Sequence, residues 1–257
     1  MTKEREREEK MYFEIQIVIG YLVAVGCAKV YMKNREPLRL MVLTAVHNEF
    51  LCFASAMMTI GLAFELEMLI KTRGLHAAFC NKDFRKPVDT WALDYNARDL
   101  GFWMYMYYFS KFYELVDTFL IVFKKKPLIF LHVYHHAIAI LIVGSWIDYS
   151  IYYGYFGSII NTAIHIVMYY YYAISNQGYR PNWKRYIADA QIIQFFTDIA
   201  LSLPVLYYTF TESTPRSWGC AGVGIYSFGL AVIITFIFLF MQFRTATYPA
   251  RYKNPVN

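Results

Sequence analysis

Three histidines within five residues, His132, His135 and His136, are the side chains of this sequence best suited to chemistry. They lie in LHVYHHAIAI, residues 131–140, a segment otherwise apolar enough to cross a lipid bilayer. Positions i, i+3 and i+4 of a helix share one face, so the three imidazoles are predicted to meet one substrate. Ionisable residues at membrane depth usually face a bundle interior, which favours a functional site over interhelical hydrogen bonding alone.

The preceding apolar segment carries charged side chains that need partners. Lys111, Glu114 and Thr118 share a helical face, and Asp117 lies beside that face. Because an unpaired buried charge is costly, we expect Lys111 to neutralise Glu114 and Asp117 to accept an N–H from a histidine. A purely structural salt bridge is the alternative.

Two later apolar segments also carry polar side chains. One has Asn161 and His165 a turn apart, and the other has Asp189, Gln191, Gln194 and Asp198. This is too much polarity to face lipid. The segments from residue 100 to residue 209 are therefore predicted to enclose a polar core.

The composition identifies the class of protein that holds these residues. Hydrophobic residues make up 58% of the 257 residues and charged residues 17%, which a soluble domain would hardly carry. Several runs approach the ~20 residues that span a bilayer. The sequence predicts an all-α, polytopic membrane protein in one domain, residues 1–257, with seven transmembrane helices. The spans are about 12–31, 40–63, 100–123, 127–147, 151–174, 186–209 and 222–243.

The net charge of +6 is explained by membrane topology rather than by nucleic acid binding. The loops after the first, third and fifth spans, together with the C-terminal tail, hold twelve Lys or Arg with Glu36 as the only acid. The positive-inside rule places these segments in the cytosol and the N-terminus on the far side. Six basic residues between 71 and 99 argue against this assignment. No cleavable signal peptide is visible at the N-terminus.

Two cysteines bear on the topology as well. Cys80 and Cys220 fall in the two longest far-side loops, where an oxidising lumen would allow a disulfide. Two free thiols are the alternative.

At these residues the sequence resembles the ELO fatty acid elongases. The family's K-x-x-E-x-x-D-T, H-x-x-H-H and N-x-x-x-H-x-x-M-Y-x-Y-Y motifs are complete, as Lys111 to Thr118, His132 to His136 and Asn161 to Tyr172. The T-x-x-Q-x-x-Q motif keeps Gln191 and Gln194 but has Ala188 in place of threonine. Including Asn34 to Pro37 and Asn48, the match runs from about residue 32 to residue 243.

This resemblance implies a 3-oxoacyl-CoA synthase that condenses a long-chain acyl-CoA with malonyl-CoA, releasing carbon dioxide and CoA. It suggests His135 as the acyl acceptor, His165 facing it, and His132 and His136 orienting it and exchanging protons. Lys111, Asn161 and histidine N–H groups could stabilise an enolate, because hydrogen-bond donors in a dry site favour developing negative charge. Substrate-binding candidates are Gln191, Gln194, Tyr169 and Tyr172. No cofactor or metal is expected.

Coenzyme A would give the basic loops a second role. Its phosphates would be attracted to Lys124, Lys125, Lys126, Arg180, Lys184, Arg185 and Arg244, although topology alone also explains these residues. The acyl tail would lie among the spans, where Phe195, Phe196, Leu201 and Leu203 could line a tunnel or simply pack. By resemblance we expect an endoplasmic reticulum membrane protein that works with the reductases and dehydratase of the elongation cycle. A homo-oligomer stays open.

Other readings of the histidines use a metal or no chemistry at all. Di-iron desaturases need more clustered histidines than the six of this chain, of which His47 and His76 lie apart. A zinc-dependent membrane lipid hydrolase needs fewer ligands and stays open. A non-enzymatic seven-span transporter or receptor leaves the histidines without a common purpose. Cys52 has no neighbouring base in sequence, which disfavours it as the nucleophile.

Overall fold

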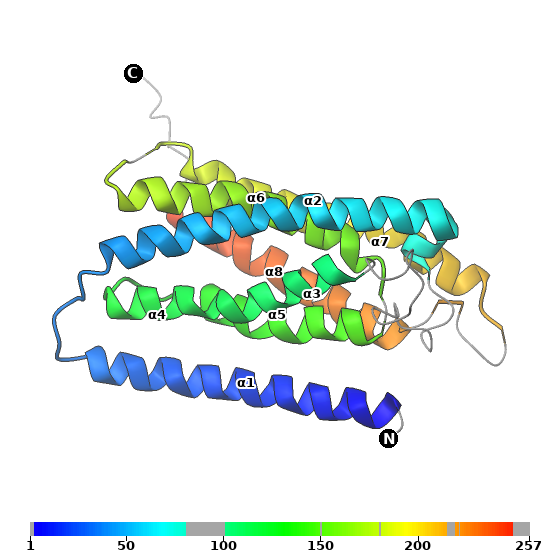
Figure 1. The fold of residues 1–257 in the computed structure, drawn as a ribbon, viewed down its shortest axis with the longest axis horizontal. Coiled ribbons are helices and arrows are strands. Elements are labelled where there is room, and N and C mark those ends of the chain that lie inside the picture. The colour runs from blue at the N-terminus through cyan, green and yellow to red at the C-terminus, as the bar shows by residue number, and fades with distance from the viewer. Residues whose placement is uncertain are drawn as a thin grey trace, which may run out of the picture.

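The chain folds as a bundle of long α-helices (Figure 1). The computed structural model describes residues 3–80, 101–149, 151–179, 181–214, 219–220 and 222–248. Within these residues the helices are α1 (Lys3–Met32), α2 (Met41–Phe79), α3 (Phe102–Tyr113), α4 (Leu115–Phe123), α5 (Phe130–Asp148), α6 (Gly154–Asn176), α7 (Lys184–Thr211) and α8 (Val223–Thr247). A helix satisfies its own backbone hydrogen bonds, which lipid cannot do, so apolar runs of this length fold as helices.

Six helices pack side by side as a closed ring. Along the ring α2 contacts α3, α3 contacts α5, α5 contacts α8, α8 contacts α7, α7 contacts α6, and α6 returns to α2. Helix α1 lies outside the ring against α4 and α5, at the lower edge of the bundle in Figure 1. The residues that share a chemical site must therefore project from several helices into the middle of the ring.

Membrane insertion follows from the length and outer surface of these helices. Five of them, α1, α2, α5, α7 and α8, are long and apolar enough to cross a bilayer. Their outward side chains include Phe53, Ile60 and Phe238, each more than 60% exposed. Such apolar surface is typical of a protein whose solvent is lipid. The chain is therefore a multi-pass membrane protein.

Two of the seven predicted spans do not meet that criterion, so the count of seven stays a prediction. The predicted helix 151–174 coincides with α6, which buries polar side chains such as Ser158, Thr162 and His165. The predicted helix 100–123 is divided into α3 and α4 at Glu114. At this junction the Ser110 hydroxyl and the Lys111 ammonium both donate to the Glu114 carboxylate.

Helix α2 continues well beyond the predicted end at residue 63. Glu65, on the extension, is buried and accepts a hydrogen bond from the Trp103 N–H at 2.8 Å, at the start of α3. The helix kinks at Gly74, whose φ of +81° is a conformation that glycine adopts without strain. The extension carries Cys80 to the far end of the bundle.

Helix α1 is anchored to the ring by buried polar contacts. The Tyr108 hydroxyl donates to Glu14 Oε1 at 2.5 Å, and Lys10 Nζ lies 2.6 Å from Asp148 Oδ1. The Glu14 carboxylate occupies the space where Gly144 has no side chain. Because Glu14 is only 2% exposed, its charge is matched inside the protein rather than by water.

The basic connections gather at one end of the bundle. The turn between α4 and α5 contacts the α1–α2 connection through Lys125 Nζ and the Lys33 carbonyl, and the end of α6 through Lys124 Nζ and Asn176 Oδ1. The first turns of α7 and the last turns of α8 lie at the same end, on the left of Figure 1, and there Arg244 of α8 pairs with Asp189 of α7. This grouping agrees with the predicted common side. Arg180, Arg251 and Lys253, and the loop residues 81–100, lie outside the described residues.

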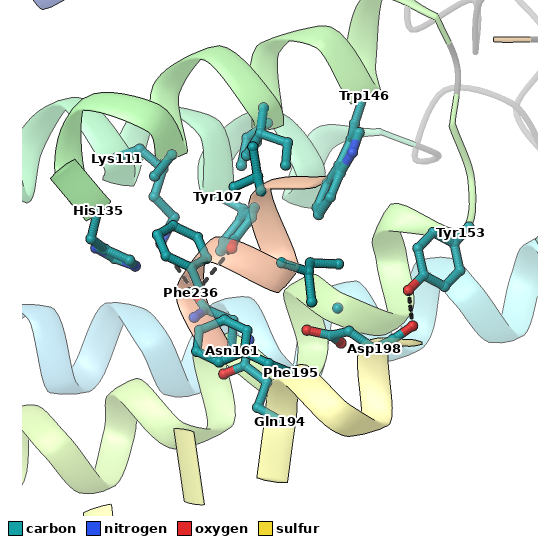
Figure 2. A pocket seen from close by; sticks show the side chains of 16 residues that line it. Tyr107, Lys111, His135, Trp146, Tyr153, Asn161, Gln194, Phe195, Asp198 and Phe236 are labelled. Carbon is teal, nitrogen blue, oxygen red and sulfur yellow. Dashed lines mark hydrogen bonds between the residues drawn. The ribbon is translucent and has the colours of Figure 1, made fainter. Parts of the chain in front are cut away.

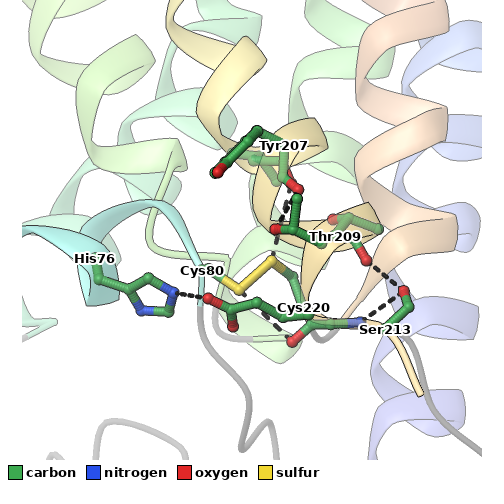
Figure 3. The surroundings of a disulfide bond; sticks show 10 residues. His76, Cys80, Tyr207, Thr209, Ser213 and Cys220 are labelled. Atoms are coloured by element: carbon green, nitrogen blue, oxygen red, sulfur yellow. Dashed lines mark hydrogen bonds and ion pairs between the residues drawn. A yellow bond between two sulfur atoms is a disulfide. The ribbon is translucent and has the colours of Figure 1, made fainter.

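A disulfide lies at the opposite end (Figure 3). Cys80 and Cys220 are bonded, with their Cα atoms 5.1 Å apart, and both are buried. Beside the bond, His76 Nε2 lies 2.8 Å from Glu212 Oε1. The bond links the end of α2 to the connection between α7 and α8 across 140 residues of sequence.

We predict that this disulfide stabilises the folded protein because it restricts the conformations of the unfolded chain. Closing a loop of this length removes about 5 kcal/mol of conformational entropy from the unfolded state. Cys220→Ser should therefore lower the thermal midpoint of the purified protein by several degrees. Alkylation without reductant should label Cys27, which is exposed, and leave Cys80 and Cys220 unlabelled. Labelling of both would show that no bond forms.

Candidate active site

A cavity inside the ring brings several predicted site residues together (Figure 2). The space open to the centre of a water-sized sphere is about 60 Å³. This is several times the roughly 10–15 Å³ that one water requires. Its polar wall includes Lys111, His135, Asn161, Gln194 and Asp198. The apolar part of the lining includes Ala139, Ile142, Val143, Val232, Ile233 and Phe236.

The cation of this cavity is Lys111, which is 3% exposed. Its ammonium donates to Glu114 Oε1 at 2.8 Å and to Asn161 Oδ1 at 3.3 Å. The Tyr107 hydroxyl also donates to Asn161 Oδ1, at 3.0 Å, and the ammonium lies 4.3 Å from the centre of the Tyr107 ring. The predicted pairing of Lys111 with Glu114 is confirmed. These contacts hold the Asn161 amide with its oxygen toward α3, which leaves its N–H groups for another partner.

The three motif histidines stay together on α5 but have different neighbours. The centre of the His136 ring lies 4.4 Å from that of His132 and 5.2 Å from that of His135. His132 Nε2 is 3.0 Å from the Thr118 hydroxyl, which in turn lies 2.8 Å from the hydroxyl of Tyr21. Only His135 of the three lines the cavity. The prediction that all three meet one substrate is therefore too broad.

Asp117 pairs with a histidine as predicted, but the histidine is not one of the three on α5. Its Oδ1 lies 2.8 Å from Nε2 of His47 on α2, and its Oδ2 accepts a hydrogen bond from the Tyr169 hydroxyl at 2.8 Å. The partner of Asp117 is thus a histidine that sequence reasoning set apart from the cluster. The ring of His47 also stacks on Tyr113, with centres 5.1 Å apart. The sequence did carry a signal for this contact, because His47 is an ionisable residue inside an apolar span.

The fourth predicted imidazole, His165, belongs to the Glu114 side of the site. Its Nδ1 lies 3.7 Å from Glu114 Oε1, and its ring meets Tyr169 edge-on. The other oxygen of Glu114 is buried without a hydrogen-bond partner. His165 is not among the residues that line the cavity, and it lies beside the Glu114 carboxylate of the Lys111–Glu114 pair.

Only some of the predicted substrate-binding residues within the spans line the cavity. Gln194 lines the cavity, whereas the Gln191 amide points to the sulfur of Met168. Tyr169 is almost fully buried on Asp117, and Tyr172 is 42% exposed. Of the tunnel candidates, Phe195 lines the cavity, and Phe196, Leu201 and Leu203 are not among the lining residues.

The basic candidates form the surface at the end of the bundle nearest the motif histidines. Lys125, Lys126, Lys184 and Arg185 are exposed, while Lys124 is half-buried and donates to Thr44 Oγ1 and Asn176 Oδ1. Arg244 forms an ion pair with Asp189 at 2.5 Å. Partial burial and the nearby Lys126 charge lower the pKa of Lys124 below that of an ordinary lysine.

Possible metal ligands come together elsewhere. In the described part of the chain, the ligand atoms of His76, Cys80 and Glu212 lie within 4.8 Å of one another, beside the disulfide in Figure 3. Cys80 is already bonded to Cys220, so its sulfur offers no thiolate there. This group lies at the opposite end of the bundle from the basic surface.

The cavity has the parts that an acyl-transfer reaction needs. It offers an imidazole at a largely apolar wall, with an ammonium and an amide beside it. In a site from which water is excluded, such donors stabilise an oxyanion or enolate far better than they do in water. The apolar wall suits a hydrocarbon chain.

Comparison with known proteins finds relatives that match nearly the whole chain. Residues 8–255 match the model of the ELO family, described as the GNS1/SUR4 family. The chain is 33% identical over 237 residues to fatty acid elongase A of Dictyostelium discoideum. This match covers 92% of this chain and 83% of the relative. It is 31% identical over 235 residues to long chain fatty acid elongase 2 of Caenorhabditis elegans. This match covers 89% of this chain and 80% of the relative.

The buried ion pair leads to a prediction on stability. Lys111→Met leaves the Glu114 carboxylate buried without its cation, which should cost about 3–5 kcal/mol of unfolding free energy. Lys111→Met combined with Glu114→Gln should recover most of that loss, although it should not recover activity. Thermal unfolding in detergent measures both effects.

The exposed pair of Arg5 and Glu9 on α1 provides a matched control. Arg5→Met should change stability by less than about 1 kcal/mol, because water already solvates both charges. Equal losses for Lys111→Met and Arg5→Met would contradict the importance of the buried pair.

Proposed function

This chain belongs to the ELO family and is an enzyme of fatty acid elongation, and we propose that it catalyses the condensation step. In that step an acyl group passes from acyl-CoA to a two-carbon unit supplied by malonyl-CoA, with loss of carbon dioxide. The observation that carries the proposal is the position of His135. It is the one motif histidine that shares a cavity with Lys111 and Asn161.

In the first half-reaction a nitrogen of His135 attacks the thioester carbon of acyl-CoA. The C–S bond breaks, CoA leaves as the thiolate, and an acyl-imidazole forms. The Lys111 ammonium and the Asn161 amide N–H groups, which line the same cavity, would stabilise the tetrahedral oxyanion. The neighbouring His136, whose ring centre lies 5.2 Å from that of His135, is the candidate acceptor for the proton that His135 loses.

In the second half-reaction malonyl-CoA loses carbon dioxide, and the electrons of the broken C–C bond form an enolate. Its carbon attacks the acyl-imidazole carbonyl, so that a new C–C bond forms and His135 leaves as a neutral imidazole once it regains its proton. The products are 3-oxoacyl-CoA and carbon dioxide. The enolate oxygen belongs to the malonyl thioester and the tetrahedral oxyanion to the acyl carbonyl, so the site must stabilise negative charge at two neighbouring points. Lys111, the Asn161 amide and histidine N–H groups are the candidate donors for the two oxygens.

The basic end of the bundle is where both CoA groups would bind. His135 lies in the second turn of α5, nine residues after the basic turn at Lys124, Lys125 and Lys126. A thioester at His135 would therefore leave the nucleotide among these lysines. Because CoA is cytosolic, this end would face the cytosol and the disulfide end the lumen of the endoplasmic reticulum.

The acyl-enzyme can be tested without malonyl-CoA. One equivalent of CoA should be released from acyl-CoA in a single turnover, and His135→Ala should reduce that release at least about a hundredfold. His76→Ala is a control histidine at the other end of the bundle. Unchanged CoA release from His135→Ala would contradict the assignment of the nucleophile.

The lowered pKa of Lys124 predicts a pH dependence of substrate binding. If the ammonium binds a CoA phosphate, the KM for acyl-CoA should rise on the alkaline side of neutrality, below the pH at which an ordinary lysine loses its proton. Lys124→Arg keeps the charge at all these pH values and should flatten that rise. A KM profile shared by the wild type and Lys124→Arg would contradict a role for Lys124 in CoA binding.

A further inference from the structure

Helix α1 brings a buried hydroxyl to the motif histidines. The helix lies outside the ring, against α4 and α5, at the lower edge of the bundle in Figure 1. Tyr21 of α1 is nevertheless only 5% exposed. Its hydroxyl lies 2.8 Å from Thr118 Oγ1 on α4, and this oxygen lies 3.0 Å from His132 Nε2 on α5. The Tyr21 ring also meets Phe119 edge-on. Three helices therefore share one chain of hydrogen bonds.

The burial of this chain decides the direction of its hydrogen bonds. Thr118 is 0% exposed, so its hydroxyl is not satisfied by water. Among the residues that the structure describes, Thr118 is the one hydrogen-bond partner of the Tyr21 hydroxyl. The phenol therefore donates to Thr118 Oγ1, because its hydrogen would otherwise be buried without an acceptor. The Thr118 hydroxyl is then left to donate, and its acceptor is His132 Nε2.

This direction assigns the tautomer of His132. A ring nitrogen that accepts a hydrogen bond carries no proton, so the neutral ring holds its proton on Nδ1. His132 then has no vacant basic nitrogen, because its Nε2 lone pair is engaged by Thr118. The ring centre of His136 lies 4.4 Å from that of His132 and 5.2 Å from that of His135. Of the two neighbouring imidazoles, His136 is therefore the one left to act as a base.

The Tyr21 hydroxyl is needed because the threonine has a competing acceptor. A threonine in a helix often donates to the carbonyl four residues earlier, as Thr162 does here at 2.9 Å. For Thr118 that carbonyl belongs to Glu114. The hydrogen bond from Tyr21 fixes Oγ1 and polarises its O–H group, which strengthens the bond to His132. Without the phenol, the hydroxyl is free to turn toward its own helix.

We propose that Tyr21 is a positioning residue for the condensation, acting through the Thr118 hydroxyl to hold His132 in its Nδ1–H form. The proton that leaves the acylated His135 ring then passes to His136, while CoA departs as the thiolate. The inference rests on the proposed function, because it takes His135 as the nucleophile. It also gives the helix outside the ring a part in the chemistry.

Removing one hydroxyl tests the proposal. Tyr21→Phe keeps the ring against Phe119, and it should lower kcat about tenfold, the order of effect of one hydrogen bond. The KM for acyl-CoA should not change, because Tyr21 does not line the cavity. Tyr226→Phe is the matched control. It removes an equally buried hydroxyl, which donates to the Ser202 carbonyl at 3.0 Å, and it should keep the wild-type kcat.

The tautomer can be observed without substrate. With ¹⁵N-labelled histidine, the NMR signals of the ring nitrogens distinguish a protonated nitrogen from a bare one. The signals of His132 are those that His132→Gln removes. The wild type and Tyr226→Phe should show a protonated Nδ1 and a bare Nε2, and Tyr21→Phe should show a mixture of both tautomers. Loss of packing alone would not produce this change.

A second pair of variants tests the middle of the chain. Thr118→Ser keeps the hydroxyl and should keep most of the wild-type kcat and the wild-type tautomer. Thr118→Val has a similar shape without the hydroxyl, and it should repeat the loss of kcat and the mixed tautomers. If Tyr21→Phe is not recovered folded, the comparison of these two variants decides, and equal kcat and equal spectra would overturn the proposal.

The outcomes separate this inference from the proposed function. A wild type that releases no CoA from any acyl-CoA overturns the proposed function and the role of Tyr21 with it. In an active wild type, a proton on Nε2 of His132 overturns the positioning role alone. Equal kcat values for Tyr21→Phe and Tyr226→Phe, or a Tyr21→Phe spectrum like that of the wild type, also overturn it. A lower kcat together with mixed tautomers, in Tyr21→Phe only, is the expected result.

Discussion

The buried ion pair between Lys111 and Glu114 is the interaction on which the rest of the site depends. Two charges in a lipid-embedded bundle are tolerated only when each is neutralised and hydrogen-bonded. The pair meets this condition by recruiting Ser110 and Asn161 from two helices, and His165 approaches the same carboxylate. It therefore ties α3 to α6 and keeps a cation next to the cavity. When a reaction step develops negative charge in the cavity, the Lys111 ammonium is already there to stabilise it.

The ring of six helices arranges the groups around this ion pair in a fixed order along the bundle. Charged groups lie at the basic end, polar groups in the middle beside His135, and apolar groups beyond them as far as Trp146. An acyl-CoA matches that order, because its nucleotide is anionic, its thioester polar and its chain apolar. A glycine allows the arrangement, since a Cβ atom at Gly154 would lie 2.7 Å from the indole of Trp146, which lines the cavity.

Local sequence spacing predicted the parts of the site that lie within one helix. Lys111 and Glu114 are three residues apart on one helix, so their pairing needed no tertiary information. The contact of Asp117 with His47 joins residues 70 positions apart and depends on how α2 packs against α4. The same limit applies to the histidines. Spacing places them on neighbouring positions of one helix, but only the surrounding helices decide that His135 faces the cavity and His132 faces Thr118. Hydropathy predicted where the helices lie, and it could not show that Glu114 interrupts one of them.

Locating the acyl group on the protein tests the central claim most directly. The enzyme would be mixed with a labelled long-chain acyl-CoA in the absence of malonyl-CoA, quenched, digested and mapped by mass spectrometry. The account predicts one labelled peptide that contains residues 131–140, with the fragment ions placing the acyl group on His135, and loss of the label when malonyl-CoA is added before the quench. An acyl group on Cys52 or on His165, or a label that malonyl-CoA does not remove, would contradict it.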